Sequence, residues 1–200
     1  MQKGIILFDI DKTIYDTDHQ AEDFDKVIAS VLSRSDVVSL KDSNDDRQFS
    51  PEVYTKRLCE KYDFKNQDRL LEVFYADKYK HIYEDNIFPE TRIVLDNLKN
   101  KFRLGIYSEA THKFQIHKFK ATGLEKYFDK DLVFILDAKD TEGAIKNIPD
   151  GALVVDNNEH ICEFLTEHGI KVIWLNKKDD KVSPDFPTIH NLLELSGKLM

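Results

Sequence analysis

The sequence predicts an α/β protein in which a mostly parallel, doubly wound sheet carries helices on both faces and is interrupted by an inserted helical segment. Three observations support this prediction. Short apolar runs alternate with longer amphipathic segments along most of the chain. Residues 16–86 instead hold helical patterns in succession, without a convincing strand. Acidic or hydroxyl side chains end several apolar runs, and ligands bind at that edge of a parallel sheet.

Five apolar runs are expected to form a Rossmann-like sheet. In chain order they are Gly4–Asp9, Arg103–Ser108, Leu132–Leu136, Ala152–Asp156 and Lys171–Leu175. Helical spacing of apolar residues predicts connecting helices over Glu90–Lys101, Lys113–Ala121 and Ile161–Glu167. Gly123 and Gly169 follow the last two helices and provide their stop signals.

The helical insertion shows two apolar stripes. One contains Phe24, Val27, Ile28, Val31 and Leu32, and the other contains Leu70, Leu71, Phe74, Lys78 and Ile82, with one polar member. Between them, the polar stretch Ser33–Ser50 predicts a mobile loop. Ser50 and Pro51 provide an N-cap and a first helical residue for the next helix.

Length and composition limit the organisation of the chain. Its 200 residues suit one core domain with a modest insertion, which we place at residues 1–15 and 87–200 for the core and 16–86 for the insertion. With 41% hydrophobic and 33% charged residues, the composition is that of a globular protein rather than a disordered or membrane chain.

The net charge of −8 disfavours nonspecific binding of nucleic acid or anionic lipid. No stretch approaches the roughly 20 apolar residues of a membrane span, and the first apolar run is too short for a signal peptide. Cys59 and Cys162 lack metal-binding spacing, so we expect two buried thiols in a reducing compartment. These features predict a cytoplasmic protein.

The strongest chemical signal is the pair Asp9 and Asp11, which directly follows the first apolar strand. Two carboxylates at a buried strand end are costly unless a cation compensates them. A divalent metal explains the pair: Asp9 can bind Mg²⁺ through one oxygen and attack phosphorus with the other. Asp11 can then donate and accept the protons. Taken alone, both acids could also simply cap a turn.

Two further strand ends reach the same edge. Ser108 ends the second strand and could donate a hydrogen bond to a phosphoryl oxygen, although a serine there, taken alone, would more often be a helix N-cap. Asp156 ends the fourth strand and brings a third acid to the edge, where it completes a plausible metal site with Asp9.

These residues resemble the motifs of the haloacid dehalogenase superfamily, specifically its phosphatase-like members. Asp9-Ile10-Asp11-Lys12-Thr13 matches the first motif, DxDxT, and Ser108 matches the second. The resemblance implies that Asp9 is the nucleophile and a metal ligand, that Asp11 is the acid and base and gives a backbone carbonyl to Mg²⁺, and that Asp156 completes the metal site. The presence of Asp11 favours phosphoryl over haloalkane substrates.

The third motif supplies a lysine, for which Lys139 is the better match and Lys146 the alternative. We expect the phosphate to contact Asp9, Thr13, Ser108, Glu109 and Lys139. The fourth motif usually has a second acid, but its positions hold Val155 and His160 here. His160 could be a ligand, a partner of a metal-bound water or, as we favour, a residue of the next helix turn. Glu159 is an alternative acid.

The insertion matches the helical cap of many superfamily members, which closes over the site and recognises the leaving group of the substrate. Its basic residues Lys56, Arg57, Arg69 and Lys78 are candidate substrate contacts, although most are expected to be solvated. We interpret His112 and His117 as structural, and Asn176–Lys181 as a solvated turn without function.

The resemblance implies a Mg²⁺-dependent phosphomonoester hydrolase that acts on a small phosphorylated metabolite through an aspartyl-phosphate, as a monomer or homodimer. A phosphomutase and a non-catalytic phosphate-binding or regulatory module are the alternatives.

Overall fold

A computed structural model describes residues 3–41 and 48–199. Its sheet contains β1 (Gly4–Phe8), β2 (Phe102–Glu109), β3 (Val133–Leu136), β4 (Leu153–Asp156), β5 (Lys171–Leu175) and β6 (Thr188–Ile189). All neighbouring strands are parallel, in the order β3-β2-β1-β4-β5-β6. The five predicted strands are confirmed. The sixth was not predicted because a two-residue strand is too short to show a pattern.

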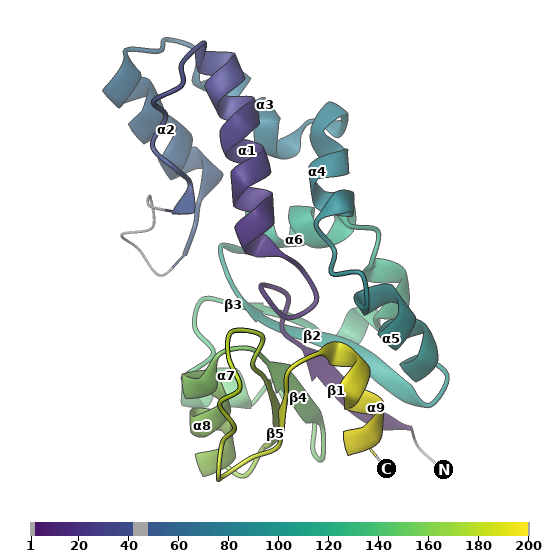
Figure 1. Cartoon of the computed structure of the whole chain (residues 1–200). Coiled ribbons are helices and arrows are strands. Elements are labelled where there is room, and N and C mark those ends of the chain that lie inside the picture. The colour runs from purple at the N-terminus through teal and green to yellow at the C-terminus, as the bar shows by residue number, and fades with distance from the viewer. Residues whose placement is uncertain (1–2, 42–47, 200) are drawn as a thin grey trace.

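Strand β1 lies in the middle of the sheet, between β2 and β4 (Figure 1). Phe8, its last residue, pairs with Ile106 on one side and with Val155 on the other. The residues that follow Phe8, Ile106 and Val155 therefore emerge at one edge, as the carboxyl ends of parallel strands do.

The core helices are α5 (Thr91–Leu98), α6 (His112–Ala121), α7 (Glu142–Ile145), α8 (Glu159–Glu167) and α9 (Leu195–Lys198). Successive β1 residues point to opposite faces, so Ile6 and Phe8 join one apolar cluster and Leu7 joins the other. Gly123 and Gly169 adopt positive φ angles of 65° and 76° after α6 and α8. The predicted doubly wound organisation and both stop signals are confirmed.

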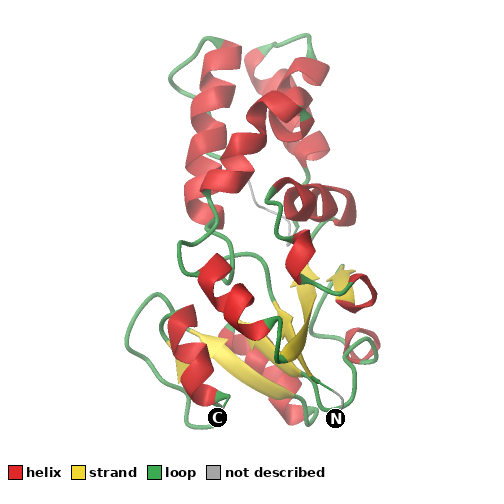
Figure 2. Cartoon of the chain, turned by 90° about the vertical axis from the view of Figure 1, so that its right-hand side faces the viewer, coloured by secondary structure: helices red, strands yellow, loops and turns green. Residues whose placement is uncertain are grey.

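The segment between β1 and β2 forms α1 (Thr17–Leu32), α2 (Pro51–Tyr62), α3 (Gln67–Tyr75) and α4 (Lys80–Asp85). Figures 1 and 2 show these helices as an elongated body that extends away from the sheet and from both chain termini. The Ser50 side chain caps α2 as predicted, accepting from Val53 N. Part of the predicted loop, residues 42–47, lies outside the described residues.

The second predicted stripe is not one continuous helix. Helix α3 ends at Tyr75, a 3₁₀ turn covers Asp77–Tyr79, and α4 begins at Lys80. Lys78 is exposed and pairs with Glu72. The break places this one polar member outside the buried face, whereas Phe74 and Ile82 remain in the core.

An aromatic cluster joins the insertion to the core. Phe114 on α6 packs edge-on against Phe49 and Phe74, with ring centroids 5.3 and 6.1 Å apart. His117, one turn further along α6, packs against Tyr75 and Tyr83. The predicted structural role of His117 agrees with these contacts.

The chain crosses between core and insertion at two adjacent points. Tyr15 and Ile87 form an isolated antiparallel bridge, and the backbone N–H of Asp16 donates to Asn86 O at 2.8 Å. The outgoing and returning segments therefore lie side by side.

Two other expectations can be compared with the described residues. Cys162 is buried, but Cys59, on α2, is only partly buried. The prediction of two buried thiols is therefore wrong for Cys59. Within residues 3–41 and 48–199, no helix is long and apolar enough to cross a membrane.

Candidate active site

Asp9 lies directly after β1 and is almost completely buried. Its backbone N–H donates to Val155 O at 2.9 Å, which extends the pairing of β1 with β4. The chain then turns sharply: Lys12 has a left-handed φ of 60°, and Ile14 N donates back to Ile10 O. This turn returns Thr13 to the site, where its hydroxyl donates to Asp9 Oδ2 at 3.3 Å.

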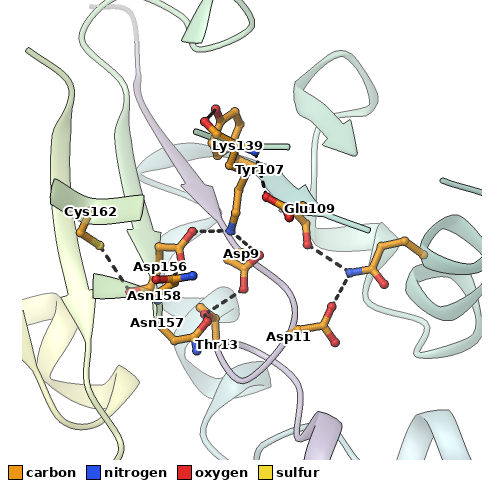
Figure 3. A network of polar contacts seen from close by, with 12 residues as sticks. Asp9, Asp11, Thr13, Tyr107, Glu109, Lys139, Asp156, Asn157, Asn158 and Cys162 are labelled. Atoms are coloured by element: carbon orange, nitrogen blue, oxygen red, sulfur yellow. Dashed lines mark hydrogen bonds and ion pairs between the residues drawn. The ribbon is translucent and has the colours of Figure 1, made fainter. Parts of the chain in front are cut away.

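Lys139 connects the acids of β1 and β4 (Figure 3). Its Nζ lies 2.9 Å from Asp9 Oδ1 and 2.5 Å from Asp156 Oδ2, and all three side chains are buried. Lys146 is exposed at the end of α7 and reaches neither acid. Of the two candidate lysines, the structure therefore brings Lys139 into the site.

The backbone of Lys139 is held by two side chains from β2. Its N–H donates to Glu109 Oε2 at 3.0 Å, and the Tyr107 hydroxyl donates to its carbonyl at 3.2 Å. The carboxylate of Glu109, a predicted phosphate contact, is thus engaged in positioning Lys139.

The charges in this cluster do not cancel. Burial raises the pKa of Asp9 to about 7, and the negative charges of Asp156 and Asp11 add to this effect, whereas Lys139 opposes it. Burial disfavours the charged form of Lys139, but Asp156 and Asp9 together hold its pKa above its usual value. One ammonium between two buried carboxylates leaves a net negative centre that would attract a further cation.

The donor set of this centre suits Mg²⁺, which prefers oxygen ligands, keeps several waters and commonly uses one or two protein carboxylates. Asp9 and Asp156 provide two carboxylates, which lie close together because both contact Lys139 Nζ. Among the described residues, no group of three or more His, Cys, Asp or Glu side chains could hold a metal ion. The resemblance implies that the backbone carbonyl of Asp11 would be a third protein ligand.

Asp11 has a separate set of partners. Its Oδ1 lies 2.5 Å from Lys118 Nζ and accepts from the Thr17 hydroxyl, and its Oδ2 accepts from Gln115 Nε2 at 2.6 Å. Burial favours its neutral form, but Lys118 and the hydrogen bonds from Thr17 and Gln115 hold the pKa of Asp11 below its usual value. Asp11 is therefore ionised in this arrangement.

Ser108 is completely buried near the end of β2, at the predicted edge. Its Oγ accepts from the same Gln115 amide group, at 3.1 Å. Gln115 thus links the second-motif serine to Asp11.

The sequence did not identify Lys118 and Gln115 as site residues. Both lie on the buried face of α6, together with Phe114 and Phe119. A lysine on the apolar face of a helix is rarely buried without an acidic partner. The position of Lys118 on the apolar face of the helical pattern was therefore the signal that could have identified it as a site residue.

The fourth-motif positions contain no additional acid. Val155 is buried in β4, and His160 lies exposed in the first turn of α8, 3.6 Å from Asp140. This location agrees with the favoured interpretation of His160. The Glu159 carboxylate instead forms an ion pair with Lys181, at 2.7 Å.

A cavity of about 840 Å³ contains Asp9, Asp11 and Lys139. The predicted functionless turn, Asn176–Lys181, contributes to its wall, which corrects its interpretation as merely solvated. Lys177, for example, is anchored by Glu90 at 3.1 Å. By contrast, Lys56, Arg57, Arg69 and Lys78 are exposed and line neither this cavity nor the smaller one beside Asp11.

A family model and several solved structures are similar to this chain. The family model for haloacid dehalogenase-like hydrolases matches residues 6–148. No curated protein sequence matches the chain. Among solved structures, a haloacid dehalogenase (HAD) phosphatase from Thermococcus onnurineus is 24% identical, with a TM-score of 0.67 over 99% of this chain and 98% of that one.

Two more solved structures share the fold. The proposed HAD-hydrolase YfnB from Bacillus subtilis, bound to magnesium, is 17% identical, with a TM-score of 0.65 over 100% of this chain and 99% of that one. A proposed beta-phosphoglucomutase from Thermotoga maritima is 14% identical, with a TM-score of 0.68 over 98% and 100%. Because the family model covers most of the chain and includes Asp9, Ser108 and Lys139, this protein belongs to the haloacid dehalogenase-like hydrolases.

Proposed function

We propose that this protein hydrolyses a small phosphorylated metabolite, with Mg²⁺ as cofactor and Asp9 as nucleophile. The observation that carries the proposal is the convergence of Asp9 and Asp156 on Lys139, at 2.9 and 2.5 Å, at the carboxyl edge of the sheet. A buried, net negative centre with one fixed ammonium suits a site where a metal ion and a phosphoryl group bind together.

Asp9, Asp156 and the backbone carbonyl of Asp11 would hold the metal ion. When bound, Mg²⁺ would offset the charge of the carboxylates and of the phosphoryl oxygens. Lys139 contributes a second positive charge from the protein itself, and the hydroxyls of Thr13 and Ser108 can donate to phosphoryl oxygens.

The reaction proceeds in two displacements. An Asp9 carboxylate oxygen attacks phosphorus, the bond to the leaving oxygen breaks, and Asp11 protonates that oxygen. Water then attacks the aspartyl-phosphate, Asp11 takes its proton, and inorganic phosphate leaves with Asp9 regenerated. An arriving phosphate dianion favours protonation of Asp11, because a nearby negative charge raises the pKa of a carboxyl group.

The domain organisation and partners form part of the same proposal. We place the catalytic core at residues 1–15 and 87–200 and assign the cap role to residues 16–86. The net charge of −8 favours small phosphorylated substrates over nucleic acid. A cytoplasmic location and a monomeric or homodimeric state complete the proposal.

The test is phosphate release from p-nitrophenyl phosphate with and without Mg²⁺, with Asp9→Asn as the control for contaminating phosphatase. We expect metal-dependent turnover that Asp9→Asn abolishes. Phosphate release also separates a hydrolase from a phosphomutase, which returns the phosphoryl group to its substrate. Wild-type turnover no greater than that of Asp9→Asn, across a panel of phosphorylated metabolites, would contradict the proposal.

A further inference from the structure

Lys177 lies where three segments of the chain meet, beside the catalytic cavity that it lines. Its Nζ lies 3.1 Å from Glu90 Oε1, 3.0 Å from the centroid of the Phe88 ring and 3.4 Å from Thr13 O. The Lys177 side chain is 22% exposed and that of Glu90 is 13% exposed. An ammonium in this position loses part of its hydration, and a carboxylate, an aromatic face and a carbonyl replace it.

The backbone before Lys177 is held in place by the contacts of Asn176. The Asn176 N–H donates to Ile189 O at 2.9 Å, and the Asn176 carbonyl lies 2.9 Å from His190 Nδ1. The Asn176 side-chain amide donates to Lys181 O at 3.0 Å. The Lys177 side chain therefore starts from a backbone that is fixed against β6 and against its own turn.

The turn after β1 is held from outside through two consecutive carbonyls. Thr13 O accepts from Lys177 Nζ, and Ile14 O accepts from the Thr91 hydroxyl at 2.9 Å in a buried contact. Both donors depend on the segment that returns from the insertion, because Thr91 belongs to it and its Glu90 anchors Lys177. This segment thus helps to set the position of the turn.

The position of Thr13 affects the proposed nucleophile. The Thr13 hydroxyl lies 3.3 Å from Asp9 Oδ2 and 3.4 Å from Asn157 Oδ1, while Lys139 contacts Asp9 Oδ1. A hydroxyl has one proton to donate, so a displacement of the Thr13 backbone changes which oxygen receives it. On the proposed function the same hydroxyl also donates to the phosphoryl group, so its position affects the alignment of Asp9 with phosphorus.

We propose that Lys177 is a positioning residue for phosphoryl transfer: its ammonium, anchored by Glu90, holds the Thr13 carbonyl and so orients the Thr13 hydroxyl toward Asp9 and the phosphoryl group. Lys177 acts through Thr13 on the group that all phosphomonoesters share, so its loss affects these substrates alike. The proposal rests on the phosphatase function proposed above and gives a role to a turn for which the sequence predicted none.

The test measures kcat and KM of Lys177→Met with p-nitrophenyl phosphate and phenyl phosphate, which differ only in their leaving groups. Methionine keeps the length of the side chain and removes the ammonium. We expect kcat to fall about tenfold for both substrates and KM to change less than about twofold, because misplaced groups slow the chemical step. Lys177→Arg, which keeps a positively charged donor, should recover most of the loss.

Arg103→Met is the matched control for the loss of a partly buried ion pair. The Arg103 side chain is 33% exposed and contacts Asp129 and Asp131, at 2.6 and 2.8 Å. Arg103 lies near the amino end of β2 and lines neither the catalytic cavity nor the smaller one beside Asp11. Arg103→Met should keep the wild-type kcat, which separates the position of Lys177 from the general cost of losing an ion pair.

Glu90→Gln keeps the proposal testable if Lys177→Met does not fold. It removes the charge that anchors Lys177 but keeps the size of the side chain and an oxygen that can accept a hydrogen bond. We expect kcat to fall about threefold with an unchanged KM, because the ammonium is held less firmly against Thr13 O.

A wild-type kcat in folded Lys177→Met would overturn the positioning role, as would a wild-type kcat in Glu90→Gln. A loss confined to KM, or to one of the two substrates, would also overturn it, because Lys177 would then contact the leaving group. Wild-type turnover that depends on Mg²⁺ and Asp9 would show that the phosphatase function survives such results. If the wild type turns over no phosphomonoester, that function fails, and the positioning role fails with it.

Discussion

Lys139 contacts two carboxylates whose combined charge exceeds its own. Its side chain is only 6% exposed, and those of Asp9 and Asp156 are 5% and 0% exposed. In such surroundings each charge is stabilised mainly by the others, because little water reaches them. Loss of the ammonium would leave two buried acids without a protein cation in contact with both.

Lys139→Met should therefore lower the free energy of unfolding by about 3–5 kcal/mol in the absence of metal. Lys146→Met, at the exposed lysine of the same region, should change it by less than about 0.5 kcal/mol. Urea denaturation in the presence of EDTA measures both values. Equal stability of the two variants would show that the contacts of Lys139 with Asp9 and Asp156 do not stabilise the fold.

His117 gives a prediction about pH. Burial lowers the pKa of His117 from its usual 6.5, although the charge of Asp77 and a backbone hydrogen bond at Phe74 oppose this effect. The unfolded chain therefore binds a proton at His117 more readily than the folded chain, so stability falls as the pH drops below about 6.5. His117→Phe removes this contribution and keeps an aromatic ring.

The measurement is the urea midpoint of each protein at about pH 7.5 and about pH 5.5. The fall in midpoint should be smaller for His117→Phe than for the wild type. An identical fall in both proteins would mean that His117 is protonated equally well in the folded and unfolded states.

At the scale of elements, β2 packs too closely against its neighbours to carry a side chain at Gly105. A Cβ added there would lie 2.5 Å from both Leu132 O and Leu7 Cδ2. Gly105→Ala should thus destabilise the protein by about 1–3 kcal/mol through overpacking. Gly143→Ala, in α7, is the matched control, because the nearest atom would lie 3.9 Å from its Cβ.

Thermal unfolding of both alanine variants distinguishes close packing from a general intolerance of substitution. We expect a lower Tm for Gly105→Ala and an unchanged or slightly higher Tm for Gly143→Ala, since alanine favours helix. If Gly105→Ala kept the wild-type Tm, the neighbouring strands would have to move apart at little cost.

The elements that could be predicted from sequence are those with local patterns. Continuous apolar runs predicted five strands, and Asp9, Ser108 and Asp156 were placed at their ends. The partners of Lys118 could not be predicted in the same way, because Asp11 lies 107 positions away and only tertiary packing brings the two together. Lys113 and Lys120 on the same helix are exposed, so lysine content alone did not distinguish the buried one.

At the scale of the whole molecule, the proposed metal should stabilise the fold. A ligand that binds only the folded state raises stability by about 2.7 kcal/mol at a concentration 100 times its Kd. We expect Mg²⁺ to raise the wild-type Tm relative to EDTA, and Asp156→Asn to lose most of this rise. The control is a monovalent salt at matched ionic strength. No rise in the wild type at saturating Mg²⁺ would argue against the metal site.

The helical insertion could be replaced as a module, because the chain enters and leaves it at adjacent points, Tyr15–Ile87 and Asp16–Asn86. Because the two segments already lie side by side, a turn of about two to five residues could rejoin them without displacing β1 or β2. Such a shortened chain would need a polar residue in place of Phe114, whose partners Phe49 and Phe74 would be gone. On the function proposed above, its catalytic edge would then be open to phosphate groups on macromolecules as well as on small molecules.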